Sequence, residues 1–210
     1  EHKTNKDLVF ISQYREDQIN HPILFVAEDK EVLKKDFYKV EEQLLPIISK
    51  FCKEKGFNLV ICGAGRAADE YDFFNNILGK NNFEFSNLAD ELSSYRLINN
   101  CLCVASIDST LGMEAFGRKI PTALFPSRYR FINLESFKSI LSINNVVEKF
   151  WTDSLEESKI REILDYVSNL KTIGTENLWE KYHPVIMNYD KKNIKIKKLI
   201  NDILNTGKNE

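Results

Sequence analysis

Several features that define common protein classes are scarce or missing in this sequence of 210 residues. No window approaches the roughly 20 consecutive apolar residues that cross a bilayer, and the N-terminus lacks the apolar core of a signal peptide. Lys and Arg number 29 and Asp and Glu 31, so the net charge is −2 and the basic excess of a dedicated nucleic-acid binder is missing. We therefore expect a cytoplasmic protein without a nucleic-acid partner.

Residues that bind metal ions or form disulfides are also few. The three histidines are far apart, and the four cysteines contain one close pair, Cys101 and Cys103, with no second pair at the spacing of a zinc site. Disulfides are rare in the cytosol, so we interpret the cysteines as structural thiols. We expect no metal and no cofactor.

The sequence does contain enough apolar material for a folded domain. Hydrophobic residues make up 43% of it, with 14 Phe, 8 Tyr and 2 Trp, which excludes disorder as the main description. No internal repeat and no linker rich in Pro, Gly or Ser divides the chain, so one domain over residues 1–210 is the default. This length, without an initial Met, fits either a complete domain or half of a two-domain protein.

Short apolar runs alternate with helical patterns through the first 125 residues. Strands are predicted at residues 8–12, 58–62, 101–106 and 121–125, and helices at residues 31–55, 67–78, 88–99 and 110–116. Strands that are apolar on both faces and alternate with helices predict a parallel sheet covered on both sides. We therefore predict an α/β fold, a Rossmann-like doubly wound parallel sheet.

The pattern is weaker after Pro126. Arg128 and Arg130 are interpreted as part of a solvated loop, although they could reach the same cleft as the strand ends. The later elements are a helix around residues 134–141, a strand near residues 146–147 and amphipathic helices over residues 155–170 and 192–204. The last helix is rich in lysine. Most such helices dock their apolar face on the domain, and binding to an anionic membrane surface is the alternative.

Three predicted strand ends carry residues suited to a ligand site. In an open parallel sheet, ligands bind beyond the carboxyl ends of the strands. The three ends are the turn at residues 12–15, the turn at residues 63–66 and the segment at residues 106–112. If the sheet forms as predicted, all three face one cleft.

The third strand end indicates a phosphate site. It leads into a helix whose N-terminus favours an anion, where Ser109 and Thr110 add hydroxyl groups and Gly112 would let a phosphate approach closely. Glu114, one turn into the helix, could accept hydrogen bonds from ribose hydroxyls. The alternative is that Asp108 or Ser109 caps the helix and Glu114 completes the capping arrangement.

The first two strand ends supply arginines. Gly63 and Gly65 resemble part of a dinucleotide-binding fingerprint, although their turn follows the second strand instead of the first. Arg15 and Arg66 could each fork onto a phosphate or a carboxylate. The alternative for each arginine is a solvated surface charge.

The stretch from residue 88 to residue 125 resembles the donor-binding half of GT-B glycosyltransferases, and especially bacterial transferases of lipopolysaccharide and capsule synthesis. In that superfamily, which includes the UDP-N-acetylglucosamine 2-epimerases, a strand leads into a Ser/Thr/Gly turn and then to a Glu on the next helix. Here these parts read Val-Ala-Ser-Ile-Asp-Ser-Thr-Leu-Gly-Met-Glu. The resemblance implies that Ser109, Thr110 and Gly112 bind the donor's phosphates and that Glu114 binds its ribose.

The same resemblance extends to the first loop of the donor domain, where such enzymes often place a basic residue. It assigns Arg15 to phosphate, and we place Arg66 with it. Further candidates in the cleft are Ser12, Gly63, Gly65 and Asp108.

The resemblance implies one half of a GT-B fold with C-terminal helices, the nucleotide-sugar-binding domain of a glycosyltransferase for cell-surface polysaccharide. Its partners would be a nucleotide-sugar donor and a carbohydrate or lipid-linked acceptor, the latter held by an N-terminal domain preceding residue 1, so we interpret the chain as part of a longer protein. Peripheral contact with the inner face of the membrane is a further option. The alternatives are a nucleotide-sugar epimerase or hydrolase of the same architecture and a non-catalytic binding or assembly module. Thr110 and Leu111 stand where the epimerases have a glycine pair.

Overall fold

A computed structural model describes residues 6–15, 22–65, 69–86, 92–187 and 193–206. The strands are β1 (Asp7–Ile11), β2 (Ile23–Ala27), β3 (Lys30–Leu33), β4 (Asn58–Cys62), β5 (Glu84–Ser86), β6 (Cys103–Ser106) and β7 (Thr122–Leu124). The helices are α1 (Lys34–Phe37), α2 (Lys39–Lys55), α3 (Glu70–Leu78), α4 (Ser93–Asn99), α5 (Thr110–Gly117), α6 (Tyr129–Ile132), α7 (Ile140–Ile143), α8 (Glu157–Ser168), α9 (Thr172–Ile186) and α10 (Ile194–Thr206), with the 3-10 helix η1 at Glu135–Phe137.

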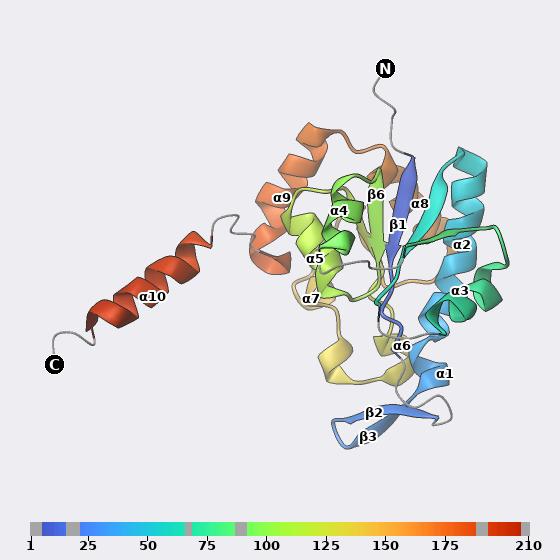
Figure 1. The fold of residues 1–210 in the computed structure, drawn as a ribbon, viewed down its shortest axis with the longest axis horizontal. Helices are drawn as coiled ribbons and strands as arrows, with labels where there is room; N and C mark the ends of the chain where they lie inside the picture. Colours follow the sequence, from blue (N-terminus) through green and yellow to red (C-terminus); the bar gives the residue numbers. More distant parts are fainter. Residues whose placement is uncertain (1–5, 16–21, 66–68, 87–91, 188–192, 207–210) are drawn as a thin grey trace.

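A five-stranded parallel sheet lies at the centre of the molecule, in the order β5-β4-β1-β6-β7 (Figure 1). The chain runs from β1 outward through β4 to β5, then returns to the other side of β1 with β6 and β7. Strand order therefore reverses between β1 and β6, and this is the switch point where open sheets of this kind bind ligands. The predicted α/β, doubly wound fold is confirmed.

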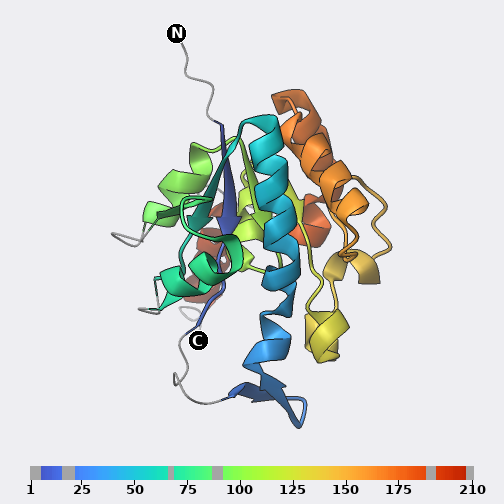
Figure 2. The same cartoon turned by 90° about the vertical axis from the view of Figure 1, so that its right-hand side faces the viewer.

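Alternate residues of β1 enter two different cores, as the period of a strand requires. Leu8 and Phe10 pack in the larger cluster with side chains of α2 and α8. Val9 and Ile11 pack in a smaller cluster with side chains of α4 and α5. Figure 2 shows α2 crossing one face of the sheet with α8 beside it. The sheet is thus covered on both faces, which explains its continuous apolar runs.

An antiparallel hairpin of β2 and β3 lies beyond the carboxyl ends of the parallel strands, at the bottom of Figure 1. Glu28 and Asp29 at its tip have positive φ angles of 52° and 58°, as in a type I′ turn. The helix predicted from residue 31 is therefore wrong at its start, and α2 begins at Lys39. The periodicity misled because Leu33, its first apolar position, belongs to β3, and Phe37, its second, packs in a separate cluster with Val32 of the hairpin.

The other predicted elements have mixed outcomes. Strands β1, β4, β6 and β7 lie where expected, and α2 ends at the left-handed Gly56. The described parts of α3 and α4 begin later than predicted, and residues 66–68 and 87–91 lie outside the described residues. The strand near residues 146–147 is wrong, because Val147 is 88% exposed and Trp151 instead bridges to Leu124 of β7. Strand β5 and helix α9 were not predicted.

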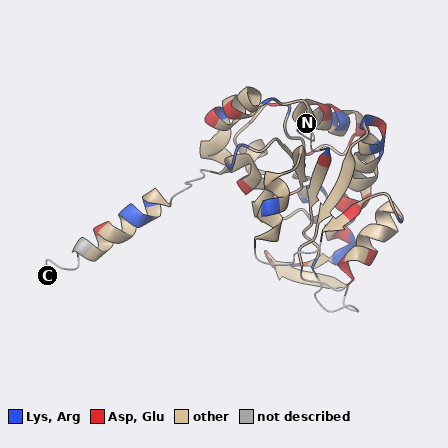
Figure 3. Ribbon diagram, turned by 45° about the horizontal axis from the view of Figure 1, so that its top comes forward, with Lys and Arg blue, Asp and Glu red and all other residues tan. Residues whose placement is uncertain are grey.

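Helix α10 lies away from the body of the domain, with its lysines visible as blue segments in Figure 3. Its apolar side chains are 49–60% exposed at Ile196, Leu199, Ile200, Ile203 and Leu204. The expectation that this face docks on the domain is therefore wrong for the described residues. None of the described helices has the length and apolar character needed to cross a bilayer.

All four cysteines are free, and three are buried: Cys52, Cys62 and Cys103. Burial raises the pKa of Cys52 to about 12 and that of Cys62 to about 11. Their environment agrees with the interpretation as structural thiols. Within the described ranges, His, Cys, Asp and Glu side chains form no group of three or more suited to a metal ion.

Candidate functional site

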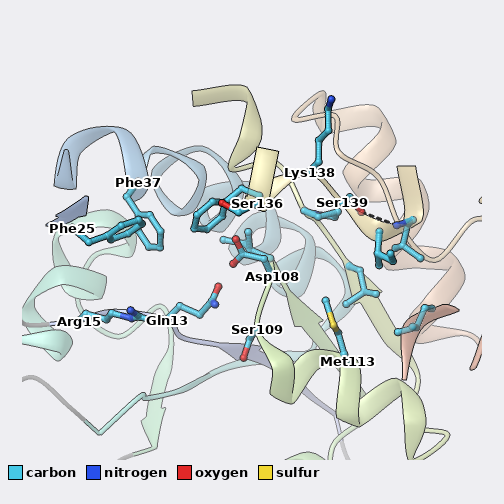
Figure 4. Close-up of a pocket in the computed structure, with 17 residues that line it drawn as sticks. Gln13, Arg15, Phe25, Phe37, Asp108, Ser109, Met113, Ser136, Lys138 and Ser139 are labelled. Atoms are coloured by element: carbon cyan, nitrogen blue, oxygen red, sulfur yellow. Dashed lines mark hydrogen bonds between the residues drawn. The ribbon is translucent and has the colours of Figure 1, made fainter. Parts of the chain in front are cut away.

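Two cavities adjoin at the carboxyl ends of the parallel strands. The first, which we call the crevice cavity, has a volume of about 420 Å³ and lies over β1, β4 and the start of α5. The second, which we call the aromatic cavity, has about 400 Å³ and lies between the hairpin, α5 and α7. They share the side chains of Gln13, Arg15, Asp108 and Ser109 (Figure 4). A ligand placed at this shared wall could extend into both.

The start of α5 forms one wall of the crevice cavity. Ser109 is the N-cap, and its Oγ accepts a hydrogen bond from the Leu111 N–H at 3.3 Å, as the capping alternative predicted. Thr110 is exposed and lines the same cavity. The helix therefore presents its positive end and two hydroxyl groups to the crevice.

Gly112 lets α5 pack closely against strand β6. A Cβ at this position would lie 2.4 Å from both the Cβ and the Oγ of Ser106. The close approach that this glycine allows is that of α5 to strand β6, and its assignment to a phosphate stays a prediction, since Gly112 lines neither cavity. Its effect on the site is indirect, since it fixes the depth at which α5 begins.

Arg128 is buried, so its interpretation as part of a solvated loop is wrong. Only 1% of its side chain is exposed, and it forks onto Glu41 of α2, with Nη2 to Oε1 at 2.6 Å and Nη1 to Oε2 at 3.0 Å. Its Nε binds Asp108 at 3.0 Å and its Nη2 binds the Gln13 Oε1 at 3.2 Å. Arg130, in contrast, is exposed and pairs with Asp153.

The neighbouring charges in this network shift the pKa values of Arg128 and Glu41. Burial alone would lower the pKa of Arg128, but the carboxylates of Glu41 and Asp108 outweigh burial and hold the pKa above its ordinary value. Burial raises the pKa of Glu41, and the adjacent guanidinium opposes that rise. The fixed positive charge of Arg128 thus holds Asp108 and Gln13 at the wall that the two cavities share (Figure 4). Asp108 pairs with Arg128 instead of capping α5.

The glycine turn after β4 donates its backbone N–H groups to a carboxylate of the protein, that of Glu70. The carboxylate of Glu70, whose residue is 2% exposed, accepts hydrogen bonds from the N–H of Ala64 at 2.8 Å and of Gly65 at 3.3 Å. It also accepts one from the Ser12 Oγ at 2.5 Å. Ser12 and Gly63 do line the crevice cavity. The N–H groups of their turn are engaged by Glu70, and Gly65, the other glycine of the fingerprint, lines neither cavity.

Arg15 lines both cavities and is exposed. Its backbone N–H donates to the Tyr38 Oη at 2.9 Å, which fixes the turn after β1. Within the described residues, its guanidinium makes no hydrogen bond or ion pair. The side chain is therefore available to a ligand. Arg66, the second predicted arginine, lies outside the described residues.

Glu114 projects toward α4, where its Oε2 accepts a hydrogen bond from the Tyr95 Oη at 2.6 Å. The capping alternative is therefore wrong for this residue. Neither cavity is lined by Glu114. Tyr95 thus holds the Glu114 carboxylate against α4, one turn beyond the start of α5.

Several residues that shape the site were not predicted to do so, or, in the case of Arg128, were noted only as part of a loop that could reach the cleft. They are Gln13, Phe25, Phe37, Glu41, Phe137 and Arg128. No local pattern distinguishes them. Arg128 was noted in the sequence, but its burial depends on a carboxylate 87 positions away.

The reversal of strand order and the crevice beside it define a Rossmann-like, doubly wound domain. A profile of one protein family, described as "putative O-antigen biosynthesis protein", matches residues 1–204, and the chain belongs to this family. Among solved structures, the crystal structure of a putative UDP-N-acetylglucosamine 2-epimerase from Listeria monocytogenes has a similar fold, with a TM-score of 0.52 at 10% sequence identity. The match covers 82% of this chain and 39% of that one. A search of curated proteins gave no match.

Proposed function

We propose that this chain binds the nucleotide-sugar donor of a bacterial glycosyltransferase that contributes to cell-surface polysaccharide. The family's description supports a role in O-antigen biosynthesis. The observation that carries the proposal is the convergence of Arg15, Ser109 and Thr110 on one crevice at the switch point of the sheet. A guanidinium that has no partner among the described residues, and that lines the same cavity as the start of a helix, suits a diphosphate.

In this proposal the donor's phosphates lie at the start of α5. The helix dipole, the hydroxyls of Ser109 and Thr110 and the Arg15 guanidinium would all stabilise the negative charge that builds up on the departing nucleotide. These groups are in place before the reaction and need no reorganisation. The assignment of Glu114 to the ribose stays a prediction, since Glu114 lines neither cavity and its Oε2 is engaged by Tyr95. We assign this chain to donor binding and leaving-group stabilisation.

Calorimetric titration tests the proposal with UDP-, GDP-, dTDP-, ADP- and CMP-linked donors. We expect saturable binding of at least one donor, and Arg15→Gln to weaken it about tenfold or more because a charge-assisted hydrogen bond is lost. Arg130→Gln is the matched control, since Arg130 is exposed, pairs with Asp153 and lines neither cavity. Absence of saturable binding by every donor would refute donor binding.

The structural neighbour is described as a putative UDP-N-acetylglucosamine 2-epimerase. This description favours one alternative, a nucleotide-sugar epimerase or hydrolase of the same architecture. Incubation of the chain with donor alone separates the two activities. Formation of an altered sugar or of free nucleotide without any acceptor supports the alternative. Donor that binds and is recovered intact supports transfer, or binding without turnover.

A further inference from the structure

Three phenylalanines from separate elements meet at the aromatic cavity. Phe25 comes from the hairpin, Phe37 from α1 and Phe137 from η1, and their ring centroids lie 5.8–6.1 Å apart. Figure 4 shows Phe25 and Phe37 on one side of the cavity and Met113 on the other. Leu141 of α7 adds to this apolar wall. Such a wall favours ligand groups that gain by leaving water.

Polar side chains on the same wall are engaged within the protein. The Ser136 N–H donates to Glu28 at 2.8 Å, and the Ser136 hydroxyl also bonds this carboxylate. The Lys138 Nζ binds Glu135 at 2.8 Å. The Ser139 Oγ accepts the bond that caps α7. The cavity therefore offers few hydrogen-bond partners away from its edge.

The polar edge of the aromatic cavity is the wall that it shares with the crevice. Gln13 and Asp108 stand there, both bound to Arg128, and Arg15 and Ser109 stand beside them. A donor whose diphosphate lies at the start of α5 therefore has one end directed into the aromatic cavity. The group next to the phosphates would meet hydrogen-bond partners first and phenyl rings beyond them.

We propose that the aromatic cavity holds the glycosyl group of the donor and selects sugars with N-acyl or deoxy substituents over fully hydroxylated hexoses. This inference rests on the proposed function. A hydroxyl group against the phenyl rings loses its bonds to water without replacement, whereas the methyl group of a 6-deoxy sugar or of an acetamido substituent gains by burial. Differences of this kind change selectivity roughly tenfold or more.

Matched donor pairs test the inference by calorimetry on the full chain. The pairs are UDP-N-acetylglucosamine with UDP-glucose, dTDP-fucose with dTDP-galactose, and GDP-rhamnose with GDP-mannose, each with the free nucleotide. In the series whose free nucleotide binds, we expect the N-acyl or deoxy donor to bind about tenfold more tightly than its partner. Free-nucleotide affinity reports on the crevice alone.

Variants of Phe137 test whether the preference for N-acyl or deoxy donors arises in the aromatic cavity. Phe137→Ser should abolish it and leave the affinity for free nucleotide unchanged, which also shows that the variant is folded. Phe137→Leu keeps an apolar wall and should retain the preference. Ile143→Ser is the control, because Ile143 is 58% exposed on α7 and does not line the cavity.

The outcomes distinguish sugar selectivity in the aromatic cavity from nucleotide binding in the crevice. Equal affinity within a pair, tighter binding of the hydroxylated sugar, or a preference unchanged in Phe137→Ser would overturn the inference and leave the proposed function standing. Failure of all five nucleotides named above, UDP, GDP, dTDP, ADP and CMP, to bind either free or as sugar donors would overturn the proposed function and this inference with it.

Discussion

Arg128 and Glu41 form a forked ion pair in the interior, with side chains 1% and 2% exposed and the closer contact at 2.6 Å. The pair connects the segment after β7 with α2, and the same guanidinium continues to Asp108 at the wall of both cavities. A buried charge pair of this kind is costly to break, because removal of one partner leaves the other charged and without water. The stability of the core and the shape of the site therefore depend on one side chain.

Loss of Arg128 should destabilise the protein strongly. We expect Arg128→Met to lower the free energy of unfolding by about 3–5 kcal/mol, measured by urea denaturation, since Glu41 is left unpaired. The double variant with Glu41→Leu should recover much of this loss, because two apolar side chains then replace two charges. Donor binding should stay weak in both variants, as Asp108 and Gln13 lose their anchor. A single variant as stable as the original chain would contradict the argument.

Substitution of Gly112 should show that this glycine serves packing. Gly112→Ala places a Cβ 2.4 Å from Ser106, so α5 must move, and we expect a loss of about 1–3 kcal/mol in thermal unfolding. Alanine is otherwise better in a helix than glycine by about 1 kcal/mol, so a clash must outweigh this gain. Ser106→Gly added to Gly112→Ala removes the obstructing atoms and should restore part of the stability. No recovery in the double variant would argue against the clash.

Glu70 should behave as a structural anion. Glu70→Gln replaces one acceptor oxygen by an NH2 group, which cannot accept a hydrogen bond from the turn, and we expect a loss of about 1–3 kcal/mol in the free energy of unfolding, measured by urea denaturation. Glu84→Gln, on the exposed side of β5, is the control and should be close to neutral. Equal stability of both variants would show that the turn holds its conformation without the carboxylate.

The buried thiols predict how stability depends on alkaline pH. Burial raises the folded-state pKa of Cys52 to about 12 and of Cys62 to about 11, from a usual 9.0. The folded chain thus holds these protons after the unfolded chain has released them, so their contribution is complete below pH 9 and is lost as pH rises toward 11–12.

Urea denaturation between pH 8 and pH 10.5 measures this loss, which should be smaller in Cys52→Ala. A thiol reagent at pH 8 should label the native chain much more slowly than the unfolded one. Rapid labelling of all four cysteines in the native chain would contradict the burial described here.

Local sequence signals predicted the centre of the fold well. Strand β1 and strand β6 are continuous apolar runs because both faces of the sheet are covered, and Ser109 marked the start of α5 as an N-cap. The position of the crevice followed from these elements alone. These parts of the site could be predicted because they depend on residues that are close together in the sequence.

What could not be predicted depends on contacts between distant residues. The hairpin was hidden because Leu33 of β3 and Phe37 continue the apolar spacing of α2, although Phe37 packs in a different cluster. Burial of Arg128 required Glu41, and occupation of the glycine turn required Glu70 to fold back onto it. An arginine and a glycine turn look the same in sequence whether their partner is a ligand or the protein itself.

The exposed apolar stripe of α10 affects how any experiment on this chain should be run. Side chains such as Leu199 and Leu204, 60% exposed along one helix, will adhere to other apolar surfaces, including detergents, chromatography resins and other copies of the chain. The colloidal behaviour of the purified chain should therefore change with its concentration. Titrations repeated at several protein concentrations will distinguish donor binding in the crevice from self-association of the chain through α10.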